Sequence, residues 1–137
     1  MEQDFNGYLF STEKSKIQIE QVEKLMQQTY WAAQRSMDVM KKAIENSICY
    51  CIYDKNRMLV GFARVITDYA TTYYICDVII DQSHRKAGLG KELLRIITND
   101  ADIKNLLGLL LTKDAHGLYE KYGFLKSGDQ FMKKAKL

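Results

Sequence analysis

The sequence predicts an α/β protein with a mixed sheet in the order βααβββαβαβ, formed by a single domain of residues 1–137. Two observations support this fold class. Three apolar runs follow one another closely across short turns between residues 48 and 80, and a helical apolar stripe then separates them from a further apolar run. The chain has no proline and no linker rich in glycine and serine, so no domain boundary is expected.

The first third of the chain predicts one strand and two helices. Residues 5–11 are expected to form a short first strand. Val22, Leu25 and Met26 recur at helical spacing and predict the first helix. Ser36 is suited to accept a hydrogen bond from the first turn of a second helix.

The middle of the chain predicts three antiparallel strands. These strands are Ile48–Asp54, Met58–Thr67 and Thr72–Ile80, and the turns between them are short. Cys49 and Cys51 lie two residues apart on the first of these strands, so both side chains face the same side and are expected in the core.

A helix and a parallel strand follow. The helix is predicted by a buried stripe of Leu89, Leu93, Ile96 and Ile97. The apolar run Leu106–Thr112 is expected to pair parallel to the preceding strand, because a helix connects the two. Asp114 is expected to cap a short helix that ends at Gly123, and Phe131 and Met132 to belong to a last strand.

Composition limits the possible partners. The net charge of +3, from 20 basic and 17 acidic residues, suits an anionic ligand but is too small for a nucleic-acid-binding stripe. No apolar run approaches the ~20 residues of a membrane span. The three cysteines are an odd number and no signal peptide precedes them, so a cytoplasmic protein is expected. No metal site is expected, because neither histidine has a second ligand at suitable spacing.

A glycine-rich turn links the third of these strands to the following helix. Arg85-Lys86-Ala87-Gly88-Leu89-Gly90-Lys91 places free amides and positive charge at a helix N-terminus, which favours an anion such as pyrophosphate. A dinucleotide-binding turn would need a third glycine after the first strand. A P-loop would need serine or threonine after Lys91, and a glycine five residues before Gly90.

This junction resembles the GNAT superfamily of N-acetyltransferases, whose signature is Arg/Gln-x-x-Gly-x-Gly/Ala after a central strand. Residues 85–90 match it in full. Element order and length agree as well, and only residues 1–16 carry little of the likeness. Many relatives have a proline near Gln82, and this chain has none.

The resemblance implies acetyl-CoA as cosubstrate, held between two strands that splay apart, Thr72–Ile80 and Leu106–Thr112. The acetyl-pantetheine arm would pair with the first of these strands, and amides of the turn would hold the pyrophosphate. The implied contacts come from Val78, Ile79, Ile80, Arg85, Lys86, Ala87, Gly88, Leu89, Gly90 and Lys91. For His116, a contact to CoA or substrate and a place beside the helix start are both open.

A second motif, Leu118-Tyr119-Glu120-Lys121-Tyr122-Gly123-Phe124, resembles the family segment whose first tyrosine lies near the CoA sulfur. A phenol with a pKa of ~10 is protonated at neutral pH and can donate its proton to a leaving thiolate, whose thiol has a pKa of ~8.5. Tyr119 is therefore the expected general acid, and Tyr122 is expected to pack.

The sequence indicates the residues that bind and deprotonate the acceptor amine less clearly. Asp77 and Asp68 are candidates for the base that deprotonates the amine, although Asp77 could instead pair with a residue such as Arg64. Simple strand alternation places Cys76 on the same face as Val78. Tyr30, Trp31 and Arg35 fall in the region that lines the acceptor pocket in the family, and ordinary helix packing with a solvated arginine is the alternative for them.

Together these features predict an N-acetyltransferase that moves an acetyl group to a primary amine of a small molecule or peptide by direct attack in a ternary complex. A non-catalytic domain that senses acyl-CoA is the alternative, and such a sensor would not need Tyr119. A homodimer is possible, because dimers are common in the family.

Overall fold

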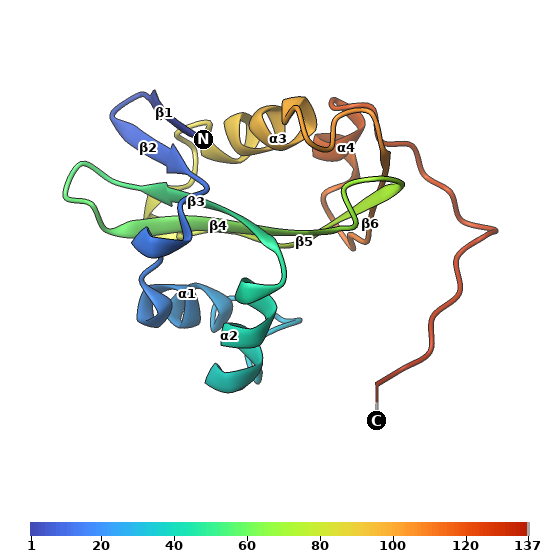
Figure 1. The fold of residues 1–137 in the computed structure, drawn as a ribbon, viewed down its shortest axis with the longest axis horizontal. Coiled ribbons are helices and arrows are strands. Elements are labelled where there is room, and N and C mark those ends of the chain that lie inside the picture. The colour runs from blue at the N-terminus through green and yellow to red at the C-terminus, as the bar shows by residue number, and fades with distance from the viewer. Residues whose placement is uncertain (137) are drawn as a thin grey trace.

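A computed structural model describes residues 1–136 and shows a six-stranded mixed sheet with helices on both faces (Figure 1). The strands lie in sequence order, and only the last pair is parallel. The predicted fold class is confirmed. The elements are β1 (Glu2–Phe5), β2 (Tyr8–Ser11), the 3-10 turn η1 (Lys14–Lys16), α1 (Ile19–Met26), α2 (Met37–Glu45), β3 (Ile48–Tyr53), β4 (Leu59–Thr67), β5 (Thr72–Ile80), the 3-10 turn η2 (Gln82–His84), α3 (Leu89–Asn99), β6 (Leu107–Leu110) and α4 (His116–Glu120).

The N-terminal segment is a hairpin, so the prediction of one strand over residues 5–11 is wrong. Asn6 and Gly7 both have positive φ, +49° and +83°, and turn the chain between β1 and β2. An Asn-Gly pair is the preferred centre of a two-residue hairpin turn, because both residues tolerate this conformation. The hairpin then pairs through β2 with β3.

The sheet divides the core into two layers. On one face α1 and α2 cover a cluster that includes Val22, Met40 and Phe62 (Figure 1). Cys49 and Cys51 are buried in this same cluster, as predicted. Ser36 caps α2, since its hydroxyl accepts a bond from the amide of Val39 at 3.3 Å. The opposite face is covered by α3 and α4, whose apolar residues form the second cluster.

A β-bulge interrupts the pairing of β4 with β5. Arg64 pairs with Cys76, but Phe62 pairs with Ile79, so β5 has one residue more than β4 in this stretch. The extra residue is Asp77, whose φ of +53° lies in the left-handed region.

The bulge reverses the alternation of side chains along β5. Tyr73 and Ile75 before the bulge and Val78 and Ile80 after it all pack in the cluster beneath α3. The prediction that Cys76 shares a face with Val78 is therefore wrong, because the extra residue shifts the two-residue period by one.

Two predictions near the C-terminus are also wrong. Asp114 does not cap α4, because the N-cap residue is Ala115, whose amide donates to the hydroxyl of Thr112 at 3.0 Å. Phe131 and Met132 form no strand. They are 53% and 92% exposed, and residues 125–136 leave the body of the protein as an extended tail without a partner strand (Figure 1).

None of the helices among residues 1–136 has the length and apolar character needed to cross a membrane.

Candidate active site

The splay between β5 and β6 opens the sheet beside the bulge. The two strands pair from Thr72 with Leu107 to Ile75 with Leu110, and the rest of β5 continues without β6. The sheet therefore offers an unpaired strand edge over residues 76–80. An extended ligand can add to such an edge through backbone hydrogen bonds.

The direction of the free backbone groups follows from one hydrogen bond. The amide of Asp81 donates to the carbonyl of Val60 on β4 at 2.8 Å. Residues of an antiparallel pair alternate between bonding to the partner and pointing away from it. Ile79 and Asp81 thus face β4, and the backbone groups of Val78 and Ile80 point into the gap.

The edge leads through the 3-10 turn η2 into the glycine-rich turn. Lys86 and Gly88 have φ values of +75° and +77°, and Gly88 is the N-cap residue of α3. The first intrahelical bond runs from the amide of Glu92 to the carbonyl of Gly88. The amides of residues 89–91 therefore have no intrahelical acceptor and form the positive end of the helix.

Cationic side chains surround this turn. Arg85, Lys86 and Lys91 are all exposed. Arg85 donates from Nε to the carbonyl of Ile80 at 3.2 Å, so its charge lies where the strand edge meets the turn. An anion at the N-terminus of α3 would gain from these side chains as well as from the amides.

The N-terminal hairpin supports the turn from the side, a contact that sequence reasoning missed. Tyr8 Oη and His84 Nδ1 share a hydrogen bond of 2.9 Å, and the side-chain amide of Gln3 donates from Nε2 to Glu92 Oε1 at 2.9 Å. These pairs are 76 and 89 residues apart in the chain. Such separations leave no local signal in a single sequence.

Tyr119 belongs to the core cluster that also contacts Val78 and Ile80, on the α3 side of the sheet. The side chain is 9% exposed and packs edge-on against Phe124, with ring centroids 6.1 Å apart. Burial, with a smaller contribution from the charge of Asp114, raises the pKa of the Tyr119 phenol above its ordinary value. The phenol is therefore a neutral donor near pH 7.

Two further residues of the α4 segment lie close to the turn or to Tyr119. Tyr122 does more than pack, because its hydroxyl donates to the carbonyl of Lys91 at 2.8 Å and ties the end of α4 to the start of α3. His116 is the half-buried first residue of α4, and both of its expected roles stay open.

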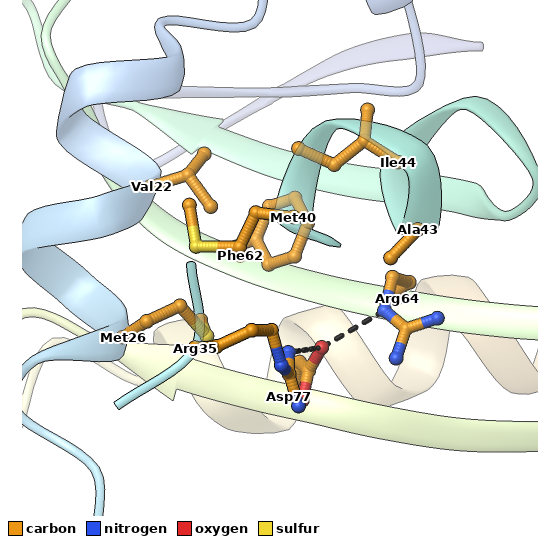
Figure 2. Close-up of a pocket in the computed structure, with 9 residues that line it drawn as sticks. All are labelled: Val22, Met26, Arg35, Met40, Ala43, Ile44, Phe62, Arg64 and Asp77. Carbon is orange, nitrogen blue, oxygen red and sulfur yellow. Dashed lines mark hydrogen bonds and ion pairs between the residues drawn. The ribbon is translucent and has the colours of Figure 1, made fainter. Parts of the chain in front are cut away.

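Asp77 is buried on the α1–α2 side of the sheet, where it meets two arginines. Its Oδ2 lies 2.6 Å from Arg35 Nη1 and 2.8 Å from Arg64 Nε (Figure 2). Burial pushes the pKa of Asp77 upward, but hydrogen bonds from Arg35 and Arg64 and their charges outweigh it and leave the pKa below its ordinary value. The carboxylate is therefore charged at neutral pH.

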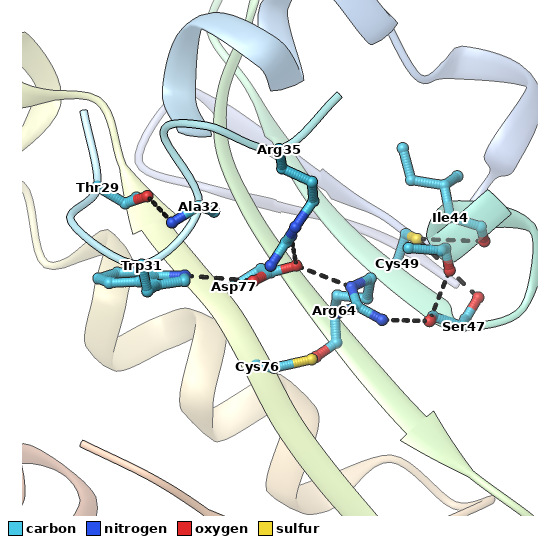
Figure 3. Close-up of polar contacts among 11 residues, drawn as sticks. Thr29, Trp31, Ala32, Arg35, Ile44, Ser47, Cys49, Arg64, Cys76 and Asp77 are labelled. Carbon is cyan, nitrogen blue, oxygen red and sulfur yellow. Dashed lines mark hydrogen bonds and ion pairs between the residues drawn. The ribbon is translucent and has the colours of Figure 1, made fainter. Parts of the chain in front are cut away.

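The predicted acceptor residues converge on the same carboxylate. Trp31 donates from Nε1 to Asp77 Oδ1 at 3.2 Å, beside the contact from Arg35 (Figure 3). Tyr30 packs edge-on against Trp31 at 5.0 Å, and Lys113 lies 5.3 Å from the Tyr30 ring centroid. The structure thus brings Tyr30, Trp31 and Arg35 together, and it adds Lys113, which sequence reasoning missed.

The space behind Asp77 is small. A cavity of about 10 Å³ lies between α1, α2 and β4 and borders Met40, Phe62 and Asp77 (Figure 2). This volume holds about one water. Trp31 and Tyr30 are the exposed members of the cluster, at 43% and 67% exposure.

Asp68, the other candidate base, caps the turn between β4 and β5. Its carboxylate accepts amide bonds from Ala70, Thr71 and Thr72, and these bonds lower its pKa. This turn lies at the opposite end of β5 from the residues beyond the bulge. Across the described part of the chain, no three His, Cys, Asp or Glu side chains come together as a metal ion would require.

Comparison with known proteins points to one family. The acetyltransferase (GNAT) family profile matches residues 19–124. The chloroplastic GCN5-related N-acetyltransferase 1 of Arabidopsis thaliana is 29% identical over 86 residues, which are 61% of this chain and 44% of that protein, so the match spans less than half of its length. The uncharacterized N-acetyltransferase ycf52 of Pyropia yezoensis is 31% identical over 133 residues, covering 92% of this chain and 75% of that protein. A crystal structure of a Xanthomonas campestris pv. campestris protein belonging to the GNAT family has a TM-score of 0.89 at 34% identity, covering 97% of this chain and 96% of that one.

Proposed function

Because the chain belongs to the acetyltransferase (GNAT) family, we propose that it transfers an acetyl group from acetyl-CoA to a primary amine of a small molecule or peptide, by direct attack in a ternary complex. One observation carries this proposal. The unpaired edge of β5 is followed, after the 3-10 turn η2, by a cationic helix N-terminus. That arrangement matches a ligand with an amide-containing arm at one end and a pyrophosphate at the other.

The donor side follows from this match. The backbone groups of Val78 and Ile80 bind the pantetheine arm as an added strand, and Ile79 between them bonds to β4 and keeps the edge straight. The pyrophosphate takes the amides of residues 89–91, and Arg85, Lys86 and Lys91 add positive charge. Ala87 precedes the Gly88 cap and packs against the α3 core cluster, which anchors the turn.

The chemistry needs a proton for the leaving group. The acceptor ammonium first loses a proton to water, and the neutral amine nitrogen then attacks the thioester carbonyl carbon. The nitrogen of the tetrahedral intermediate gives its excess proton to water, and collapse of the intermediate breaks the carbon–sulfur bond and releases the thiolate. The Tyr119 phenol donates its proton to that sulfur and regains a proton from solvent. Its raised pKa suits a donor that must be neutral before the step.

The acceptor side carries an excess of positive charge. Two arginines face one carboxylate at Asp77, and Lys113 lies nearby over Tyr30. We infer an acceptor with a carboxylate close to its amine, bound by Arg35 and stacked on Trp31. The lowered pKa of Asp77 makes its carboxylate a poor acceptor for an ammonium proton, which favours a role other than general base.

Two measurements test the proposed function. Calorimetry with acetyl-CoA is expected to show binding at one site per chain, and failure to bind would reject the proposal. Thiol release over a panel of amines, with and without a neighbouring carboxylate, is then expected to show turnover for the carboxylated members. Binding without turnover on any amine would instead favour an acyl-CoA sensor. Equal rates for carboxylated and plain amines in both wild type and Arg35→Ala would reject the acceptor class alone.

A further inference from the structure

Asp77 holds a strained position that the proposed chemistry does not use. It is the bulged residue of β5, with φ of +53°, and it is 6% exposed. A non-glycine residue in this conformation is unfavourable by itself and persists where its surroundings hold it. Asp77 lies between the strand edge proposed to bind acetyl-CoA and the segment proposed to bind the acceptor amine.

The contacts of Asp77 form a path from the sheet to that segment. On the sheet side, Arg64 of β4 donates from Nε to Asp77 and from Nη1 to the hydroxyl of Ser47 at 3.0 Å, so its guanidinium is held at two points. Towards residues 27–36, the Asp77 carboxylate accepts hydrogen bonds from Arg35 and Trp31 (Figure 3).

Residues 27–36, which we call the acceptor loop, make few other side-chain hydrogen bonds towards the sheet among the described residues. The Thr29 hydroxyl donates to the carbonyl of Met26 at the end of α1 and accepts a bond from the amide of Ala32, which is buried. The remaining side-chain hydrogen bond from the loop to this end of β5 runs from exposed Gln28 to Asp81 at 2.8 Å. Asp77 is therefore the buried polar attachment of the loop.

We propose that Asp77 is a positioning residue that pins the acceptor loop to the bulge of the donor strand. It thereby fixes the indole of Trp31 and the guanidinium of Arg35 beside the thioester, a consequence that rests on the proposed function. Removing the charge of Asp77 leaves two guanidinium groups facing each other. Because Arg64 is held by Ser47, Arg35 is the group that moves, and the loop moves with it.

Trp31 is the only tryptophan in the chain, so its fluorescence reports on the acceptor loop without interference. In Asp77→Asn, acrylamide quenching of Trp31 is expected to rise by up to about twofold, since the side chain is already 43% exposed. Asp100→Asn is the matched control. It removes the charge of an aspartate that accepts a bond from the Tyr50 hydroxyl at the end of α3, away from the loop, and quenching should stay at the wild-type value.

Kinetics separates positioning from proton transfer. With an amine that the wild type acetylates, Asp77→Asn is expected to raise the acceptor KM about tenfold and to leave the acetyl-CoA Kd within about twofold. Arg35→Gln should raise the quenching of Trp31 to the same level and the acceptor KM at least as far, because Arg35 is also the proposed ligand of the acceptor carboxylate. In the double variant, quenching should rise little further, because Asp77 and Arg35 hold the loop through one contact. Arg35→Lys should restore part of the loss.

Two results would overturn the proposal. One is wild-type quenching of Trp31 in both Asp77→Asn and Arg35→Gln. The other is a loss of kcat at unchanged KM together with loss of the acidic limb of the pH profile, which would make Asp77 the base. If Asp77→Asn does not fold, the quenching of Trp31 in Arg35→Gln decides the proposal, because Arg35 lies on a surface loop and its substitution should leave the fold intact. The quenching result stands even if the wild type fails to bind acetyl-CoA, so the two proposals can fail separately.

Discussion

At the scale of single residues, two tyrosines three positions apart are assigned different tasks. Tyr119 is buried, with a raised pKa, whereas Tyr122 is half-buried and bonds to the start of α3. The local pattern Tyr-x-x-Tyr shows only that the two share a helix face. Their partners decide their roles, and those partners come from other elements.

Tyr119→Phe is expected to lower kcat by about 10- to 100-fold, because the leaving thiolate loses its proton donor. The acetyl-CoA Kd should stay within about twofold, because the ring still fills its place in the core. Because burial raises the pKa of the Tyr119 phenol above its ordinary value, the alkaline fall in kcat caused by its ionisation should come at a higher pH than for an ordinary phenol. Thiol release measured across pH checks both points, and a wild-type rate in the variant would remove Tyr119 from its role.

Tyr122→Phe is expected to change acetyl-CoA affinity rather than kcat, the opposite of Tyr119→Phe. Loss of the bond to the Lys91 carbonyl loosens the start of α3 by roughly 0.5–1.5 kcal/mol, the usual net value of one hydrogen bond. Acetyl-CoA should then bind several-fold more weakly at nearly unchanged kcat. Calorimetry beside thiol release measures both quantities, and a fall in kcat with wild-type affinity would contradict the assignment.

At the scale of elements, the start of α3 combines helix formation with ligand binding. Gly88 needs its positive φ, but Gly90 lies in the first turn of the helix, where an added Cβ meets no atom within 4 Å. Glycine is therefore unfavourable for the helix at position 90, and its advantage is the open space above the amides.

Gly90→Ala is expected to stabilise the protein by about 0.5–1 kcal/mol, because alanine is the better helix former. It should also weaken acetyl-CoA binding at least several-fold, because the methyl group occupies the approach to the pyrophosphate. Urea denaturation and calorimetry give the two values. Gly117→Ala, in α4 with equally open space, is the control that should change affinity little. Unchanged affinity in Gly90→Ala would place the anion elsewhere.

The sequence predicts some elements better than others for physical reasons. The stripe of α3 and the turn before it are local patterns, and both are confirmed. The bulge at Asp77 is not local, because it depends on the register of β4 against β5. The contact of Asp77 with Arg64 was considered from strand adjacency, whereas its contacts with Arg35 and Trp31, 42 and 46 residues away, require the assembled fold. The hairpin of β1 and β2 does have a local signal, because Asn6-Gly7 is a preferred two-residue turn.

At the scale of the whole molecule, the sheet separates two functional layers. The predicted donor turn belongs to the side of α3 and α4, and the acceptor loop joins α1 to α2 on the other side (Figure 1). The bulge and the splay lie in β5 and connect the layers. A ligand that fills the gap should therefore stabilise the protein as a unit.

Acetyl-CoA at about 100 times its Kd is expected to add ~2.7 kcal/mol to the free energy of unfolding, from the mass-action relation. For a chain of 137 residues this corresponds to a rise in Tm of roughly 8–12 °C. Differential scanning fluorimetry with increasing acetyl-CoA measures the shift. An equal concentration of acetate is the control and should give none, and a flat response to acetyl-CoA would argue against the donor site.

The hairpin of β1 and β2 lies before residues 19–124, the segment that the family profile matches, yet it bonds to His84 and Glu92 on either side of the glycine-rich turn. The turn that we propose holds acetyl-CoA is thus braced by residues outside the segment that the family profile matches. Neither of these two hydrogen bonds involves Tyr119 or the acceptor loop. In evolutionary terms, we infer that substitutions of Gln3 and Tyr8 can change affinity for the donor without replacing any residue proposed for catalysis or for acceptor choice.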